Sequence, residues 1–93
     1  MALQFEWDKT KARLNLQKHG VSFEEAKTVF DDPLFITVLD EEHSTDEDHY
    51  ITIGQSGNRN LLLIAHAERE GSIRIISVRK ATKHEQRFYE EAE

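Results

Sequence analysis

The segment Leu61–Thr82, LLLIAHAEREGSIRIISVRKAT, decides the fold. Two runs rich in Leu, Ile and Val are joined by the short polar segment Glu68–Ser72, which contains a glycine at position 71. Two apolar runs that flank a short, glycine-containing loop are typical of a β-hairpin. We therefore predict two antiparallel strands with a tight turn between them.

The second strand of this hairpin mixes cations with apolar residues. Because side chains alternate along a strand, its residues are expected to divide into two sets: Arg74, Ile76, Val78 and Lys80 on one face, and Ile73, Ile75, Ser77 and Arg79 on the other. Apolar residues on both faces indicate a central strand that is covered on both sides at least in part. The cations near its end indicate that part of the sheet is open to an anionic ligand.

Length and composition predict one small domain, residues 1–93, with a single modest core. The chain has no cysteine and no apolar run near the roughly 20 residues that span a bilayer, and its N-terminus lacks the order of a signal peptide. These features predict a cytoplasmic protein without membrane contact. The net charge of −6 disfavours nucleic-acid binding, but residues 20–49 hold one Lys and ten Asp/Glu, whereas residues 50–81 hold five Lys/Arg and two Asp/Glu. A local basic surface therefore remains compatible with the acidic total.

Around the hairpin, local patterns predict six further elements in chain order. They are a strand at Leu3–Trp7, a helix at Lys9–Lys18 between Asp8 and Gly20, a helix that starts after Ser22 and ends before Pro33, strands at Leu34–Leu39 and Tyr50–Gln55, and a last helix that starts after Thr82. The order β-α-α-β-β-β-β-α, with four consecutive strands in a meander, predicts an α+β domain with a mainly antiparallel sheet. In the first helix, Ala12 and Leu16, with Leu14 near the edge, are expected to form the buried side, and Lys11, Asn15 and His19 a polar row.

The segment Asp40–His49, DEEHSTDEDH, is a charged connector between strands. Its two histidines beside carboxylates could bind a metal ion. The spacing matches no known metal loop, so we expect a solvated loop and no metal or other cofactor.

Long phrases of the sequence resemble the BrnT family of type II toxin–antitoxin toxins. The phrases are Phe5–Asp8 (FEWD), Asn15–Ala26 (NLQKHGVSFEEA), Val29–Pro33 (VFDDP), Tyr50–Gly54 (YITIG) and Arg74–Thr82 (RIISVRKAT), followed by a helix with Glu85 and Tyr89. The resemblance implies a RelE-like fold and a metal-independent endoribonuclease that cleaves RNA and inhibits translation. It also implies neutralisation by a BrnA-type antitoxin with a ribbon-helix-helix DNA-binding domain, so that DNA is contacted only through the antitoxin complex.

Metal-free RNA cleavage needs a base for the 2′-hydroxyl, an acid for the leaving 5′-oxygen and cations for the charge on the phosphorane. Guanidinium groups suit the cationic role because they can bind two phosphate oxygens at once. We expect Arg79 and Arg74 to bind phosphates, with Lys80 assisting. Because the two arginines have opposite parity, they can reach one phosphate only if a bulge or the strand end redirects one of them.

For proton transfer the candidates are His66 and Glu68. Four further residues are expected to contact RNA: Lys11 and His19 on the first helix, and Arg69 and Ser77 in the hairpin. Each candidate also has a purely structural interpretation. His66 could be a half-buried histidine hydrogen-bonded across the hairpin, and Glu68 could pair with Arg69 or Arg74.

A different class of function also fits the sequence. A small domain with an acidic stretch and an exposed sheet edge could act only by binding a protein partner, either as an interaction module or as an inactive toxin homologue that still binds its antitoxin. Purified protein would then leave RNA intact.

Overall fold

The structure is a computed structural model that describes residues 3–92. Its elements, in chain order, are β1 (Gln4–Glu6), α1 (Lys9–His19), α2 (Phe23–Thr28), the 3-10 turn η1 (Val29–Asp31), β2 (Ile36–Leu39), the 3-10 turn η2 (Glu41–His43), β3 (His49–Gln55), β4 (Leu61–Arg69), β5 (Ser72–Lys80) and α3 (Lys83–Glu91). This order confirms the predicted α+β arrangement. No helix among residues 3–92 is long and apolar enough to cross a membrane.

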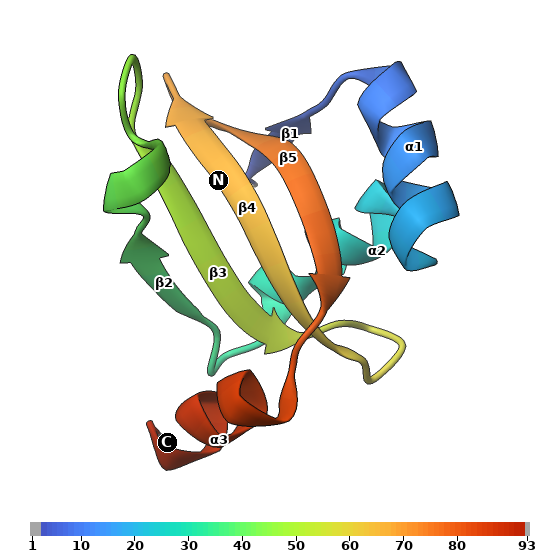
Figure 1. Cartoon of the computed structure of the whole chain (residues 1–93), viewed down its shortest axis with the longest axis vertical. Coiled ribbons are helices and arrows are strands. Elements are labelled where there is room, and N and C mark those ends of the chain that lie inside the picture. Colours follow the sequence, from blue (N-terminus) through green and yellow to red (C-terminus); the bar gives the residue numbers. More distant parts are fainter. Residues whose placement is uncertain (1–2, 93) are drawn as a thin grey trace.

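The five strands form one sheet in the order β1-β5-β4-β3-β2 (Figure 1). Strands β2 to β5 pair antiparallel as the predicted meander, and β1 adds to β5 in parallel. The hairpin turn has two residues, Glu70 and Gly71, with φ angles of 49° and 84°. Positive φ at both positions is the geometry that a two-residue hairpin needs to match the twist of its strands.

One face of the sheet is covered by α1 and α2, and we call it the helix-covered face. Its core joins residues of these helices and their connections to residues of β4 and β5: Val21, Phe23, Ala26, Val29, Leu62, Ile64, Ile73, Ile75 and Val78. Trp7 packs edge-on against Phe23 with ring centroids 5.9 Å apart, which makes it a core aromatic. The burial of these side chains supplies the main stabilising free energy of the domain.

Helix α1 is attached to the sheet by a polar side chain rather than by leucines. Asn15 is buried and donates to the backbone oxygens of Val21 and Val78, at 3.0 and 2.9 Å, while accepting from the Val78 amide at 3.1 Å. Leu14 and Leu16 are about half exposed. The predicted buried side of this helix is therefore wrong for Leu16, because the contact with β5 is made by the amide of Asn15.

The opposite face, which we call the open face, is covered at one end by α3, and at the other end Glu47 of the connector between β2 and β3 contacts Arg74. Helix α3 begins with the predicted capping box of Thr82 and Glu85, and lies below the strands in Figure 1. His84, Glu85 and Phe88 of α3 line a cavity of about 180 Å³ with open-face residues of three strands: Ile36, Val38, Ile51, Ile53 and Leu63. At its other end α3 is held by Tyr89, whose hydroxyl donates to Asp32 at 2.5 Å. The rest of the open face is free of helices.

Candidate active site

A β-bulge in β5 brings the two candidate arginines to one face. Ala65 of β4 pairs with Ser77, but the next residue, His66, pairs with Ile75, so Ile76 has no partner in the register. An extra residue of this kind reverses the alternation of side chains on the bulged strand. Arg74, which pairs with Ala67, and Arg79, which pairs with Leu63, therefore both project from the open face. The simple alternation predicted for β5 is wrong beyond the bulge.

At the α3 end of the open face, Arg79 forms a two-pronged ion pair with Glu85. Both nitrogens of its guanidinium fork donate to the carboxylate at 2.8 Å, and one of them also donates to the Lys80 carbonyl at 3.1 Å. Hydrogen bonds from Arg79 lower the pKa of the Glu85 carboxyl to about 2, and the same bonds raise the pKa of Arg79. The guanidinium is thus held in a fixed orientation and carries its charge at every pH of interest.

At the hairpin end, Arg74 contacts the carboxylate of Glu47, which comes from the acidic connector. The same carboxylate lies 3.5 Å from a guanidinium nitrogen of Arg69 and 3.4 Å from Nε2 of His49. Burial raises the pKa of Glu47, but the charges of Arg74 and Arg69 and the hydrogen bonds from His49 and Arg69 together outweigh burial, so the pKa lies below its ordinary value. This end of the open face is a cluster of two arginines and one histidine around one carboxylate.

The two arginines are well separated along the sheet. Their partners on β4, Ala67 and Leu63, are four residues apart, which corresponds to about 13 Å at the usual rise of a strand. The pair Ala65–Ser77, with two small side chains, lies between them in the register. The arrangement can therefore bind two different phosphates of one extended strand, rather than one phosphate with both guanidinium groups.

Residues 7–85 match the model of a protein family described as "Ribonuclease toxin, BrnT, of type II toxin-antitoxin system". The chain belongs to the BrnT family. Its fold is also similar to the crystal structure of the Brucella abortus ribonuclease toxin BrnT, with a TM-score of 0.67 and 19% sequence identity over 88% of this chain and 100% of that chain. At this identity the likeness shows a shared fold. No curated protein sequence matches the chain significantly.

In this BrnT-family chain, His66 lies away from both arginines, which corrects its predicted place beside them. It is fully buried on the helix-covered face, and its Nε2 is hydrogen-bonded to the hydroxyl of Thr52 on β3 at 2.7 Å. Burial lowers its pKa to about 4, so the ring is neutral at pH 7. The structural interpretation fits this histidine, except that its partner lies on β3 and its burial is complete.

The other predicted residues are divided between the two faces. Arg69 and Ser77 lie on the open face with the arginines. Glu68 and Lys80 belong by register to the helix-covered face, at opposite ends of the hairpin, and both are exposed. Lys11 and His19 are on α1, whose Asn15 is bonded to β5 from the helix-covered side. The structure therefore does not bring Glu68, Lys80, Lys11 or His19 to the two arginines.

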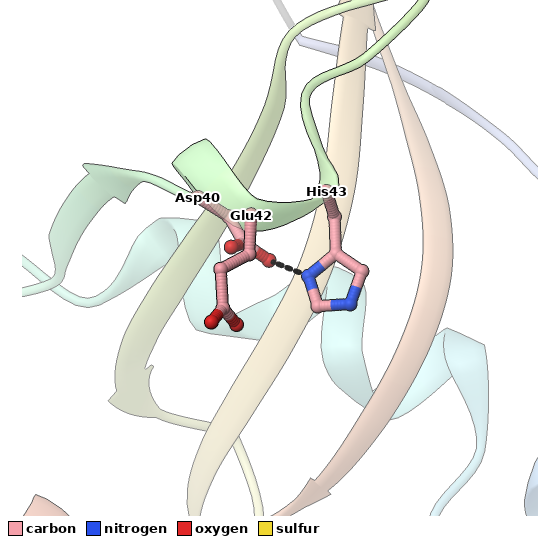
Figure 2. Close-up of side chains that lie close together, drawn as sticks. All are labelled: Asp40, Glu42 and His43. Atoms are coloured by element: carbon pink, nitrogen blue, oxygen red, sulfur yellow. Dashed lines mark hydrogen bonds and ion pairs between the residues drawn. The ribbon is translucent and has the colours of Figure 1, made fainter.

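The acidic connector also contains three groups that could together ligate a metal ion. Ligand atoms of Asp40, Glu42 and His43 lie within 4.8 Å of one another, and Figure 2 shows these side chains at the short turn η2, which Asp40 immediately precedes. Nδ1 of His43 is already hydrogen-bonded to Asp40 at 2.8 Å, and Glu42 and His43 are exposed. These three side chains are separate from the cluster at Glu47.

Sequence reasoning missed Glu47 and His49. Both fall in a segment that reads as a solvated charged loop, and the predicted strand begins one residue later, at Tyr50. In the structure β3 begins at His49, which pairs with Ala67 and shares the open face with Ile51. The alternation of His49, Ile51 and Ile53 is visible in the sequence, but only the register with β4 shows that this set faces Arg74.

Proposed function

We propose that this BrnT-family chain is a metal-independent endoribonuclease that cuts RNA on the open face of its sheet and thereby inhibits translation. The family indicates the class of enzyme, since its members are described as ribonuclease toxins. The observation that carries the proposal is the bulge at Ile76, because it turns Arg74 and Arg79 toward the same exposed surface. If β5 alternated regularly through Ile76, the side chains of Arg74 and Arg79 would project from opposite faces of the sheet.

The chemistry follows from the cations on that face. Cleavage without a metal requires fixed positive groups where negative charge develops on the phosphorane, and guanidinium groups provide this with two parallel donors. Arg79 would bind one phosphate and Arg74 another, and Arg69 and Ser77 lie close to that path. Phosphate oxygens would replace the carboxylates of Glu85 and Glu47, which pair with these arginines in the structure.

A protein partner is part of the proposal. A toxin of a type II system acts together with an antitoxin, and we propose a BrnA-type partner with a ribbon-helix-helix domain, which contacts DNA while this chain contacts RNA. Both would act in the cytoplasm.

The test is incubation of the purified protein with a defined RNA in EDTA, followed by analysis of the fragment ends. We expect fragments with 2′,3′-cyclic phosphate or 3′-phosphate ends. At low RNA concentration the rate of Arg79→Ala should be about tenfold below that of the wild type, because one charged contact to the RNA backbone is lost. Arg87→Ala is the matched control, since it removes one exposed cation from α3. Circular dichroism of each variant confirms folding.

Three results would contradict the proposal in different ways. Cleavage that stops in EDTA would exclude metal independence, and full activity of Arg79→Ala would exclude this residue. RNA left intact both alone and with translating ribosomes would favour a chain that only binds its antitoxin.

A further inference from the structure

Three side chains from three adjacent strands converge on the carboxylate of Glu47. His49 comes from β3, Arg69 from β4 and Arg74 from β5. Oε1 of Glu47 contacts both His49 and Arg74, and Oε2 contacts Arg69. Because two cations and a ring nitrogen meet at one anion, these three side chains form an anion site that an internal carboxylate occupies.

The site is held independently of the residue that fills it. Ser44 accepts a hydrogen bond from the His49 amide at 2.9 Å, and its hydroxyl donates to the Asp40 carbonyl at 2.6 Å. These bonds close the base of the loop 45–48, so Glu47 can move away without displacing His49 from β3. Residues 45, 46 and 48 are exposed, so a movement of this loop would break few packing contacts.

The cluster also contains an unsatisfied donor. Among the described residues, the buried Nε of Arg74 has no hydrogen-bond partner. A buried donor without a partner costs about 1–3 kcal/mol. A phosphodiester has two non-bridging oxygens and two ester oxygens, so it can engage a guanidinium edge more completely than the carboxylate does.

We infer that Glu47 occupies the pocket for the scissile phosphate of RNA, formed by His49, Arg69 and Arg74, and that His49 is the catalytic base there. This inference rests on the proposed function and identifies the part of the open face where the RNA bond is broken. Glu47 is then an internal competitor of the substrate, and it is displaced when RNA binds.

The reaction at this pocket needs no further reagent. Nε2 of His49 takes the proton of the 2′-hydroxyl, the 2′-oxygen attacks phosphorus, and the bond from phosphorus to the 5′-oxygen breaks. The leaving 5′-oxygen takes a proton from water. The products are a 2′,3′-cyclic phosphate and a 5′-hydroxyl, and Arg69 and Arg74 stabilise the charge on the phosphorane. Arg79, about 13 Å away along the sheet, binds a neighbouring part of the strand.

The first test measures binding without cleavage. The probe is a fluorescent oligonucleotide with 2′-deoxy sugars, which lacks the attacking hydroxyl, titrated at one fixed salt concentration because phosphate contacts depend on salt. We expect Glu47→Gln to bind about tenfold more tightly than wild type, since a competing charge is removed from the pocket. Glu42→Gln is the control: it removes the same charge from an exposed position of the same connector. An equal gain for both variants, or no gain for Glu47→Gln, would overturn the inference.

The second test measures cleavage of an all-ribose RNA in EDTA. We expect Glu47→Gln to cleave faster than wild type at low RNA concentration, and His49→Gln to lose activity about 100-fold or more. The exposed His43→Gln is the matched histidine control. Loss of activity in Glu47→Gln would overturn the inference by making Glu47 the base, and full activity of His49→Gln would overturn it while leaving the proposed function intact. RNA left intact by every variant, both alone and with translating ribosomes, would overturn the proposed function itself.

A pH profile separates a catalytic from a structural role of His49. The charged groups that face it are Glu47, Arg69 and Arg74. For the wild type and Glu47→Gln we expect the rate to fall toward acid pH, because a protonated ring nitrogen cannot accept the proton of the 2′-hydroxyl. The residual rate of His49→Gln should lack this fall, and the same profile in this variant would assign the pH dependence to another group.

Discussion

The two faces of the sheet fix their polar side chains in different ways. On the helix-covered face Asn15, Thr52 and His66 are buried and bonded to backbone groups or to one another, without any charge. On the open face, the guanidinium groups of Arg74 and Arg79 are partly exposed, and each is bonded to a carboxylate from a loop or a helix. Asn15 comes from α1, Thr52 from β3 and His66 from β4, whereas both arginines come from β5.

The difference shows which contacts can be exchanged for a ligand. A buried neutral group that loses its partner costs about 1–3 kcal/mol and has no water to replace it. An exposed ion pair contributes about 0–1 kcal/mol, so another anion can replace its carboxylate at little cost. The open face can therefore bind and release phosphates while the helix-covered face keeps the fold intact.

Asn15→Leu should break this comparison and have the largest effect. It removes the side-chain amide that bonds to the backbone oxygens of Val21 and Val78 and to the Val78 amide. A buried backbone group that loses its partner costs about 1–3 kcal/mol. We therefore expect the free energy of unfolding, measured with urea, to fall by about 3 kcal/mol or more.

Gln17→Leu provides the control, because it exchanges an amide for the same apolar side chain at an exposed position of α1. This variant should have a free energy of unfolding close to that of the wild type. An equally small loss for Asn15→Leu would show that the buried amide does not hold α1 on the sheet.

The bulge in β5 shows where sequence reasoning reaches its limit. Asp8, Gly71 and Thr82 mark their caps and turn by local chemistry, and the elements that they delimit were predicted close to their observed bounds. The bulged segment around Ile76 has no glycine or proline to mark it. Its place depends on how β4 and β5 pair when both Val78 and Ile75 are buried against the helices, which is a property of the tertiary structure.

The same limit explains the errors at the candidate site. Asn15 replaces leucine on the buried side of α1 because its amide reaches the backbone of Val78, 63 residues away in the chain. His66 looked like a catalytic histidine because strand alternation does not reveal that a neighbouring strand supplies Thr52 as a partner. Arg74 and Arg79 were found because two cations in an apolar strand are visible without knowledge of the register. Their roles remain predictions.

Protonation of His66 should have the next largest effect on the free energy of unfolding. It tests whether the buried polar groups of the helix-covered face must stay neutral. The pKa of His66 is about 4 in the folded chain, below the ordinary value of 6.5. The unfolded chain therefore binds more protons between these values, so stability should fall as the pH decreases from 6.5 to 4, by about 3 kcal/mol for the full shift. Urea unfolding at pH 7 and pH 4.5 measures this loss.

In His66→Gln the loss over this pH range should be much smaller, whatever the stability of the variant at pH 7. His43→Gln should keep the wild-type dependence, since His43 is an exposed side chain of the connector. An unchanged dependence in His66→Gln would mean that the helix-covered face does not hold this ring in its neutral form.

Glu85→Gln should have the smallest effect on stability, although it removes a two-pronged ion pair. Both side chains are partly exposed, at 38% for Arg79 and 24% for Glu85, and glutamine can still accept the capping bond from the Thr82 amide. We expect a loss of at most about 1 kcal/mol at pH 7, measured by urea unfolding. Because the pKa of Glu85 is lowered to about 2, its contribution is present above about pH 4.5 and is lost as the pH falls toward 2.

The contributions of His66 and Glu85 to stability therefore differ in the pH range in which they change as well as in magnitude. Below pH 4, where His66 is already protonated in both states, the wild type should still lose stability through Glu85, and Glu85→Gln should lose less. Glu91→Gln, an exposed carboxylate on the same helix, is the matched control. A loss of several kcal/mol in Glu85→Gln at pH 7 would make this ion pair as structural as the buried contacts of the other face. Phosphate could not then replace Glu85 on Arg79 at low cost, and RNA binding at Arg79 would require a different geometry.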